Sequence, residues 1–260
     1  MCRVAFVCLI FLSGSLSAQI RVSKLVIKAK EVYNLGQSDI LVADTLIMMD
    51  SSRLVLNKLK GENYIRVKVA RFGNYCTIDG TGYDGKTGRN GAPGVTPTGP
   101  CLNGSPGKEG TRGLDGTKGL NLFMYLEKVT IKGKLIVDLS GGKGGKGGNG
   151  GNGGGGSPGT MHCTGGNGAN GGKAGAGGNG GNAGTLTIVA ARPQVFKDLV
   201  IAKKILVNNK GGFAGPYGKG GYHGGAGLGP SKKNGKDGEP GAYNANGITG
   251  ENGNLVIQAN

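Results

Sequence analysis

Residues 140–184 read SGGKGGKGGNGGNGGGGSPGTMHCTGGNGANGGKAGAGGNGGNAG. Glycine holds two of every three positions from Gly141 to Gly154, and the pattern returns after an interruption at residues 157–164. The third position is polar or small: Lys143, Lys146, Asn149 and Asn152 before the interruption, then Asn167, Asn170, Lys173, Ala176, Asn179 and Asn182 after it. This period fits neither an α-helix nor a β-strand, but it is that of the extended polyproline II helix. The segment therefore predicts a hairpin of two extended arms.

The glycines of this repeat indicate close packing between neighbouring chains. A polyproline II chain makes no hydrogen bonds within itself, so its backbone groups need partners in other chains or in water. A face without side chains lets a second backbone approach closely enough to pair. Two glycines per triplet predict two such faces. A flexible glycine-rich linker is the alternative, but it gives no reason for the register to be kept across the interruption.

The same organisation occurs three times along the chain. Apolar runs lead into glycine at residues 76–80, 135–141 and 205–211, and lead out of it at residues 121–126, 185–190 and 254–259. Their alternation and β-branched residues predict strands, and no segment reads as a long, capped helix. Repeats at long spacing are typical of stacked architectures. We therefore expect an all-β fold, a β-solenoid-like stack of strands built from residues 19–79, 121–139, 185–209 and 254–260.

Three hairpins are expected to project from this stack. Hairpin 1 is residues 80–120, hairpin 2 is residues 140–184 and hairpin 3 is residues 210–253. Hairpins 1 and 3 follow a Gly-X-Y pattern with one glycine per triplet, whereas hairpin 2 has two. We expect hairpin 2 to lie between the other two, in a six-arm polyglycine II bundle.

Residues 1–18 have the pattern of a secretory signal peptide. Arg3 precedes an apolar run from Val4 to Leu12, and a stretch of small residues ends at Ala18. The run is too short to span a membrane as a helix, and no later segment is apolar for long enough. The mature protein is expected to be secreted, and soluble or associated with a cell surface.

The cysteines predict one disulfide. Cys101 lies in the interruption of hairpin 1 and Cys163 in that of hairpin 2, so in-register stacking brings them together. An exported protein can keep such a bond oxidised. Cys76 is then a buried free thiol. The alternative pairing joins Cys76 to Cys101.

The repeats resemble known glycine-rich families. GGKGGKGGNGGNG at residues 141–153 and GGNGANGGKAGAGGNGGNAG at residues 165–184 are similar to the polyglycine II bundles of springtail antifreeze proteins, phage tail-fibre adhesins and mycobacterial glycine-rich surface proteins. GRNGAPGV at residues 88–95 and GSPGKEGTRGLDGTKG at residues 104–119 resemble collagen. SLSAQ at residues 15–19 resembles the leader ends of secreted Bacteroidota proteins. The resemblance implies a rigid bundle that presents a flat face or variable tips.

Collagen-like repeats also permit a triple helix of three chains. The short runs, the scarcity of proline and the pairing of arms between strands favour a monomer over this trimer.

No catalytic or metal site is evident from the sequence. Asp79 and Asp138 stand where the chain leaves predicted strands, and His162 and His223 are isolated. No cluster of carboxylates with a basic partner is visible. Motifs of phosphate-binding loops occur trivially in such a composition, and none stands at a strand-to-helix turn. We expect a non-enzymatic protein without a cofactor or metal ion.

The positive charge is the strongest functional indication. The chain carries 31 Lys and Arg against 15 Asp and Glu, a net charge of +16. Regular cations on a rigid surface favour a polyanion such as acidic polysaccharide, lipopolysaccharide or extracellular DNA. The candidate polyanion-binding residues are Lys143, Lys146, Lys173, Lys219, Lys232, Lys233 and Lys236. The candidates for stacking on sugars or bases are Tyr217, Tyr222 and Tyr243.

These observations favour a secreted surface or extracellular-matrix protein that acts as a rigid, adhesin-like scaffold. Two alternatives for the side chains are that lysine keeps the bundle soluble and that tyrosine caps its outer face. Two alternative functions are ice binding and a collagen-like structural oligomer. Against ice binding, Lys and Asn stand where the antifreeze pattern has a flat row of small residues.

Overall fold

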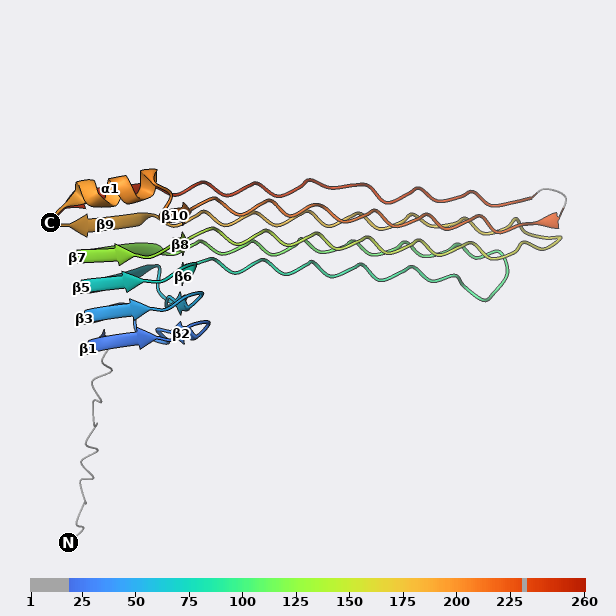
Figure 1. The fold of residues 1–260 in the computed structure, drawn as a ribbon. Coiled ribbons are helices and arrows are strands. Elements are labelled where there is room, and N and C mark those ends of the chain that lie inside the picture. Colours follow the sequence, from blue (N-terminus) through green and yellow to red (C-terminus); the bar gives the residue numbers. More distant parts are fainter. Residues whose placement is uncertain (1–18, 231–232) are drawn as a thin grey trace, which may run out of the picture.

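The computed structural model describes residues 19–230 and 233–260. The predicted signal peptide at residues 1–18 and the candidate Lys232 lie outside these residues. The described chain forms a base of β-strands, from which long extended arms project in one direction (Figure 1).

The base consists of two parallel sheets, between which the chain passes alternately. The broad sheet has the order β1-β3-β5-β7-β9-β11 and the narrow sheet the order β2-β4-β6-β8-β10. The bounds in the broad sheet are β1 (Gln19–Ile27), β3 (Ile40–Met48), β5 (Glu62–Phe72), β7 (Asn121–Ile131), β9 (Leu186–Ala190) and β11 (Leu255–Ala259). Those in the narrow sheet are β2 (Val32–Asn34), β4 (Arg53–Val55), β6 (Cys76–Asp79), β8 (Leu135–Asp138) and β10 (Ile205–Asn208). The fold is thus rich in β-strands, as predicted.

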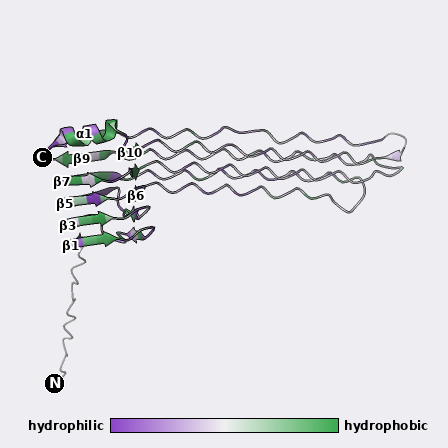
Figure 2. Cartoon of the chain, viewed as in Figure 1, coloured by the Kyte–Doolittle hydropathy of each residue, from purple (hydrophilic) through white to green (hydrophobic). Residues whose placement is uncertain are grey.

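The core of the base is made of ladders of apolar side chains, and Figure 2 shows the apolar residues concentrated in these strands. Register partners on successive strands are buried together: Leu41, Ile65, Met124 and Ile188 in the broad sheet, and Leu54, Ile78 and Val137 in the narrow sheet. Each such side chain contributes about 1.5–3 kcal/mol when it is buried. Hydrophobic stabilisation is therefore concentrated in the base.

The all-β expectation is wrong in one place. Residues 185–209 contain a helix, α1 (Pro193–Ile201), which contacts β9, β10 and β11. Pro193 stands in its first turn, where the missing N–H costs nothing, and Phe196 inserts into the core. Arg192 provides no side-chain cap. The helix is short and lacks a side-chain cap at its N-terminus, so its packing against the strands stabilises it and its local sequence gives only a weak signal.

The arms pair through their backbones in two layers. In one layer, Gly82 N donates to Ser140 O (2.9 Å) and Gly141 N to Lys210 O (3.0 Å), which joins the outgoing arms of the three hairpins. In the other layer the returning arms are joined, since Gly104 N donates to Asn167 O (2.9 Å) and Gly168 N to Lys236 O (2.8 Å). Bonds such as Gly142 N to Thr117 O (2.9 Å) connect the layers. Hairpin 2 therefore lies between hairpins 1 and 3, in the position expected from its two glycines per triplet.

The glycines of hairpin 2 are required by this packing. A Cβ at Gly144 would collide with the carbonyl oxygen of Gly178, and a Cβ at Gly145 with that of Lys86. Both clashes are with backbone, so no side-chain movement relieves them. By contrast, a Cβ at Gly225 would meet nothing within 4 Å.

Side chains in the third position of the triplets complete the hydrogen bonding. Asn149 Oδ1 accepts a hydrogen bond from Lys219 N (2.9 Å), and Asn152 Oδ1 accepts one from Tyr222 N (3.0 Å). Asn90 Oδ1 accepts in the same way from Asn149 N (2.8 Å). The glycine N–H groups already donate to carbonyl groups of neighbouring arms. The N–H groups of the residues between the glycines instead find their acceptors in these side chains. This explains why asparagine recurs at the third position.

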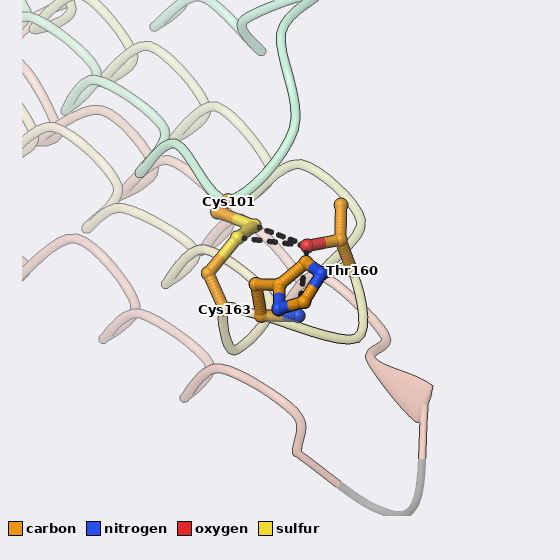
Figure 3. The surroundings of a disulfide bond; sticks show 4 residues. Cys101, Thr160 and Cys163 are labelled. Carbon is orange, nitrogen blue, oxygen red and sulfur yellow. Dashed lines mark hydrogen bonds between the residues drawn. A yellow bond between two sulfur atoms is a disulfide. The ribbon is translucent and has the colours of Figure 1, made fainter.

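The predicted disulfide between Cys101 and Cys163 is confirmed and joins the tips of hairpins 1 and 2 (Figure 3). The Cα atoms of the two cysteines are 6.1 Å apart. Cys76 is a free, buried thiol, also as predicted, and the alternative pairing with Cys101 is wrong. Burial raises the pKa of the Cys76 thiol, so it stays protonated and unreactive at neutral pH.

Candidate ligand-binding surfaces

The outgoing arms present three rows of side chains on one surface. Asp84 Oδ1 accepts a hydrogen bond from Lys143 N (2.7 Å), and Asn149 Oδ1 accepts one from Lys219 N, so these residues mark neighbouring rows. Residues three apart lie on the same side of a polyproline II helix. The outgoing face consists of Asp84, Thr87, Asn90 and Pro93; Lys143, Lys146, Asn149 and Asn152; and Phe213, Pro216, Lys219 and Tyr222.

The returning arms form the opposite surface. Asp115 Oδ1 accepts a hydrogen bond from Asn179 N (2.6 Å), and Asn179 Oδ1 accepts one from Ile248 N (3.0 Å). The returning face consists of Pro106, Glu109, Arg112, Asp115 and Lys118; Asn167, Asn170, Lys173, Ala176, Asn179 and Asn182; and Lys236, Glu239, Ala242, Ala245, Ile248 and Glu251.

Hairpin 1 adds a lateral edge between these two faces. Thr117 Oγ1 accepts a hydrogen bond from Tyr83 N (2.6 Å), and Thr111 Oγ1 accepts one from Arg89 N (2.7 Å). The hairpin 1 edge consists of Tyr83, Lys86, Arg89, Ala92 and Val95 with Ser105, Lys108, Thr111, Leu114 and Thr117.

Charge is distributed unequally over these surfaces. Among the residues assigned to the outgoing face and the hairpin 1 edge, six are cations and one, Asp84, is an acid: the cations are Lys86, Arg89, Lys108, Lys143, Lys146 and Lys219. The returning face has four cations and four acids: Arg112, Lys118, Lys173 and Lys236 against Glu109, Asp115, Glu239 and Glu251. One opposed pair there is a salt bridge, Arg112 to Asp115 at 2.7 Å. Attraction for a polyanion is therefore concentrated on the outgoing side of the bundle.

The predicted lysines do not form one site. Lys143, Lys146 and Lys219 share the outgoing face, where all three are exposed. Lys173 and Lys236 lie on the opposite face among carboxylates. Lys233 is at the exposed tip of hairpin 3, and its backbone carbonyl accepts a hydrogen bond from Gly165 N (2.8 Å). Because outgoing and returning arms belong to different layers, lysines that share a register within one hairpin can face opposite ways.

The predicted tyrosines are also divided. Tyr222 is 77 % exposed and lies one triplet from Lys219 on the outgoing face. Tyr217 and Tyr243 instead contact each other edge to face, with ring centroids 5.8 Å apart. They pack together on the lateral side of hairpin 3, where Tyr217 N donates to Asn246 Oδ1 (3.1 Å). Of these three tyrosines, Tyr222 alone lies beside the cations of the outgoing face.

Sequence reasoning missed three residues of the cationic surface. Lys86, Arg89 and Lys108 belong to Gly-X-Y triplets of hairpin 1, and each was one of two non-glycine residues in its triplet. The triplet register shows that these three side chains point away from the bundle. It does not show whether they lie on one of the two faces or on the hairpin 1 edge. The signal that resolves this is the pairing of Arg89 with Thr111 across the hairpin.

The tips offer little chemistry. Thr160 Oγ1 lies 3.3 Å from Cys163 Sγ and 4.0 Å from Cys101 Sγ (Figure 3). Beside them, His162 is exposed and donates its backbone N–H to the same hydroxyl oxygen (3.2 Å). Within residues 19–230 and 233–260, no three His, Cys, Asp or Glu side chains gather as metal ligands would.

In the same part of the chain, no helix has the length and apolar character needed to cross a membrane. Comparison with known proteins finds no matching family model, no similar curated protein and no similar solved structure.

Proposed function

We propose that the protein is a secreted, non-enzymatic, adhesin-like scaffold that binds linear polyanions on its outgoing face and hairpin 1 edge. The base would be a β-solenoid and the arms a polyglycine II bundle. The observation that carries the proposal is the unequal charge of the two faces: cations exceed acids on one and balance them on the other. If lysine served only solubility, no such separation between the faces would be required.

The geometry supports an extended ligand. At about 3.1 Å per residue, cations in successive triplets such as Lys143 and Lys146 are about 9 Å apart along the arm. The interarm hydrogen bonds hold the backbone that carries them, so little ordering entropy is lost on binding. Acidic polysaccharide, lipopolysaccharide and extracellular DNA all present repeated negative charge to such a row.

Two features support secretion and a monomer. The leader pattern at residues 1–18 and the disulfide between Cys101 and Cys163 suit an oxidising compartment. The glycine amides of the Gly-X-Y arms are bonded to other arms of the same chain, as in Gly104 N to Asn167 O. A collagen triple helix would need these amides for other chains.

The test compares two triple variants that remove the same charge. Lys143, Lys146 and Lys219 are changed to Gln on the outgoing face, and Lys118, Lys173 and Lys236 are changed to Gln on the returning face. Binding to duplex DNA, lipopolysaccharide and a long acidic polysaccharide is measured across a salt series. The outgoing variant should bind about tenfold more weakly, and its salt slope on DNA should fall by about 3. The returning variant should resemble the wild type; equal losses in both, or no binding at low salt, would contradict the proposal.

A further inference from the structure

The broad sheet carries a groove that does not belong to the bundle. The groove has a volume of about 600 Å³ and is lined by the first half of β1, the middle parts of β3, β5 and β7, the end of β9 and the residue after β11. In β3 the buried residues are Leu41 and Ala43 and then Leu46 and Met48, so the alternation changes phase at Asp44. At the same level, one residue of each of β1, β3, β5 and β7 has no register partner in the neighbouring strand. These residues are Ser23, Asp44, Lys68 and Glu127. These four residues line the hollow together with their neighbours on each strand.

One row across this groove carries two guanidinium groups. Arg21 pairs in register with Val42, and Val42 with Arg66, so one strand separates the two arginines. With strands about 4.8 Å apart, the Cα atoms of Arg21 and Arg66 lie about 10 Å from each other. Both residues are exposed and line the groove. The charge of Arg21 also contributes to the lowered pKa of Asp44. The two long side chains can therefore converge on a ligand above Val42.

The other charged groups of the groove are arranged differently. Lys68 Nζ lies 2.8 Å from Asp44 Oδ1, so these two charges largely neutralise each other. That hydrogen bond lowers the pKa of Asp44 and raises the pKa of Lys68, which keeps both ionised at neutral pH. Glu127 is the remaining acidic side chain of the groove. Asn260, the last residue of the sequence, also lines the groove, but it follows β11 at the opposite edge of the sheet from β1. Among the side chains, two arginines on β1 and β5 therefore face one carboxylate, which favours an anionic ligand on that side of the groove.

Aromatic rings continue the same side of the sheet. Tyr125 is the register partner of Arg66 and lines the groove. Two residues earlier on the same strands, Tyr64 and Phe123 stack with centroids 5.0 Å apart and planes at 11°. Side chains two apart lie on one face of a strand, so the three rings form a continuous surface beside Arg66. Such rings offer an apolar face and, in tyrosine, a polar edge.

We propose that this groove binds an acidic sugar, with its carboxylate or sulfate between Arg21 and Arg66 and its ring against Tyr125. Guanidinium groups bind planar anionic groups through two parallel hydrogen bonds, which an ammonium group cannot do. The volume falls within the range of about 300–1,000 Å³ that is typical of small-molecule sites. The site is separate from the outgoing face, and its existence does not depend on the function proposed for that face.

The first experiment measures the affinity of the full mature chain for short oligosaccharides by calorimetry. The ligands are an oligogalacturonate, a sulfated oligosaccharide and a neutral oligosaccharide of equal length. The wild type should bind at least one acidic ligand tenfold or more tightly than the neutral one. Whichever acidic ligand binds more tightly identifies the anionic group as carboxylate or sulfate. Equal affinity for neutral and acidic ligands would overturn the proposal.

The second experiment uses variants matched in charge and location. Arg21→Gln with Arg66→Gln should weaken acidic-sugar binding tenfold or more. Lys24→Gln with Arg71→Gln removes the same charge from the same two strands outside the row and should change affinity less than twofold. Glu127→Gln should strengthen binding, because it removes the carboxylate that repels the ligand. Unchanged affinity in the arginine variant would overturn the proposal.

The outgoing-face variant separates this site from the proposed function. With Lys143, Lys146 and Lys219 changed to Gln, short acidic sugars should still bind while long polyanions bind more weakly. If this variant loses the short ligand and the arginine variant keeps it, the groove proposal fails and the outgoing-face proposal stands. The reverse result supports the groove, even where long-polymer binding is absent.

Discussion

The base and the bundle achieve order in opposite ways. In the base, large side chains such as Leu41, Ile65 and Met124 fill the space between two sheets. In the bundle, neighbouring backbones touch because side chains are missing at Gly144 and Gly145. Hydrophobic burial dominates the first region, and backbone hydrogen bonds without such a core hold the second.

The two regions therefore tolerate different substitutions. A core side chain of the base can be replaced by a smaller one at the cost of a cavity. A bundle glycine has no smaller substitute, and a larger residue must move a backbone. We expect the two regions to respond differently to the same perturbation, and three predictions test this.

The largest effect is expected from removing the disulfide. Cys101 and Cys163 are 62 residues apart, and closing a loop of that size is worth about 4 kcal/mol in the chain-entropy model. In Cys163→Ser, hydrogen exchange should accelerate at bundle amides such as those of Gly154 and Gly166. It should change little at Ile65 and Met124 in the base. Equal acceleration in both regions would show that base and bundle unfold as one unit and would remove the distinction between them.

A smaller effect is expected from one methyl group in the bundle. Gly145→Ala places a Cβ against the backbone carbonyl of Lys86 and should destabilise the protein by about 3 kcal/mol, the upper end of ordinary overpacking. The measurement is the free energy of unfolding in urea.

The matched control for that variant is Gly225→Ala, because its Cβ would meet nothing within 4 Å. This variant should be neutral or more stable by up to about 1 kcal/mol, since alanine reduces the freedom of the unfolded chain. Similar losses in both variants would mean that glycine acts through flexibility and not through packing. Leu41→Ala, which should cost about 2–5 kcal/mol, gives the corresponding value for the base.

The smallest effect is expected at the junction between the two regions. Asp79 ends β6, and its Oδ1 accepts hydrogen bonds from Thr81 N (3.0 Å) and Thr81 Oγ1 (2.8 Å). Lys58 Nζ and Arg53 Nη1 lie 3.6 Å and 3.5 Å from its carboxylate. Burial opposes ionisation, but the hydrogen bonds from Thr81 and the two cations outweigh it and lower the pKa of Asp79.

A lowered pKa in the folded state fixes the direction of the pH effect. The carboxylate stabilises the fold fully above its unfolded pKa of about 4, and this contribution disappears as the pH falls through the lower folded pKa. Asp79→Asn should therefore cost about 1 kcal/mol at neutral pH, and the difference from the wild type should shrink in acid. Urea unfolding from pH 7 to pH 2 measures it. A difference that does not vary with pH would mean that the charge of Asp79 is not involved.

Much of the bundle could be predicted from the sequence because its signal is local. The three-residue glycine period fixes an arm's geometry, and the interruptions locate the tips, so the pairing of Cys101 with Cys163 followed. The helix α1 could not be predicted in this way, because its stability comes from tertiary packing: Phe196 is buried in the core, and the helix contacts β9, β10 and β11.

The surfaces were harder to predict because they depend on contacts between arms and between strands. Lys143 and Lys173 occupy equivalent triplet positions in hairpin 2, yet they lie on opposite faces. The sequence shows no cluster of carboxylates with a basic partner, but parallel pairing places Asp44, Lys68 and Glu127 in one row. The spacing of these three residues in the sequence does not predict that they lie together.

The three-residue repeat of the arms also makes the length of the molecule adjustable. Each triplet repeats the interarm bonds of the one before it, as when Gly82, Gly85 and Gly88 donate in turn to Ser140, Lys143 and Lys146. Inserting one triplet at the same level in all the arms would extend the bundle by about 9 Å and leave every existing pair in register. The reach of such a protein can therefore evolve in discrete steps, with the base and the tips carried along unchanged.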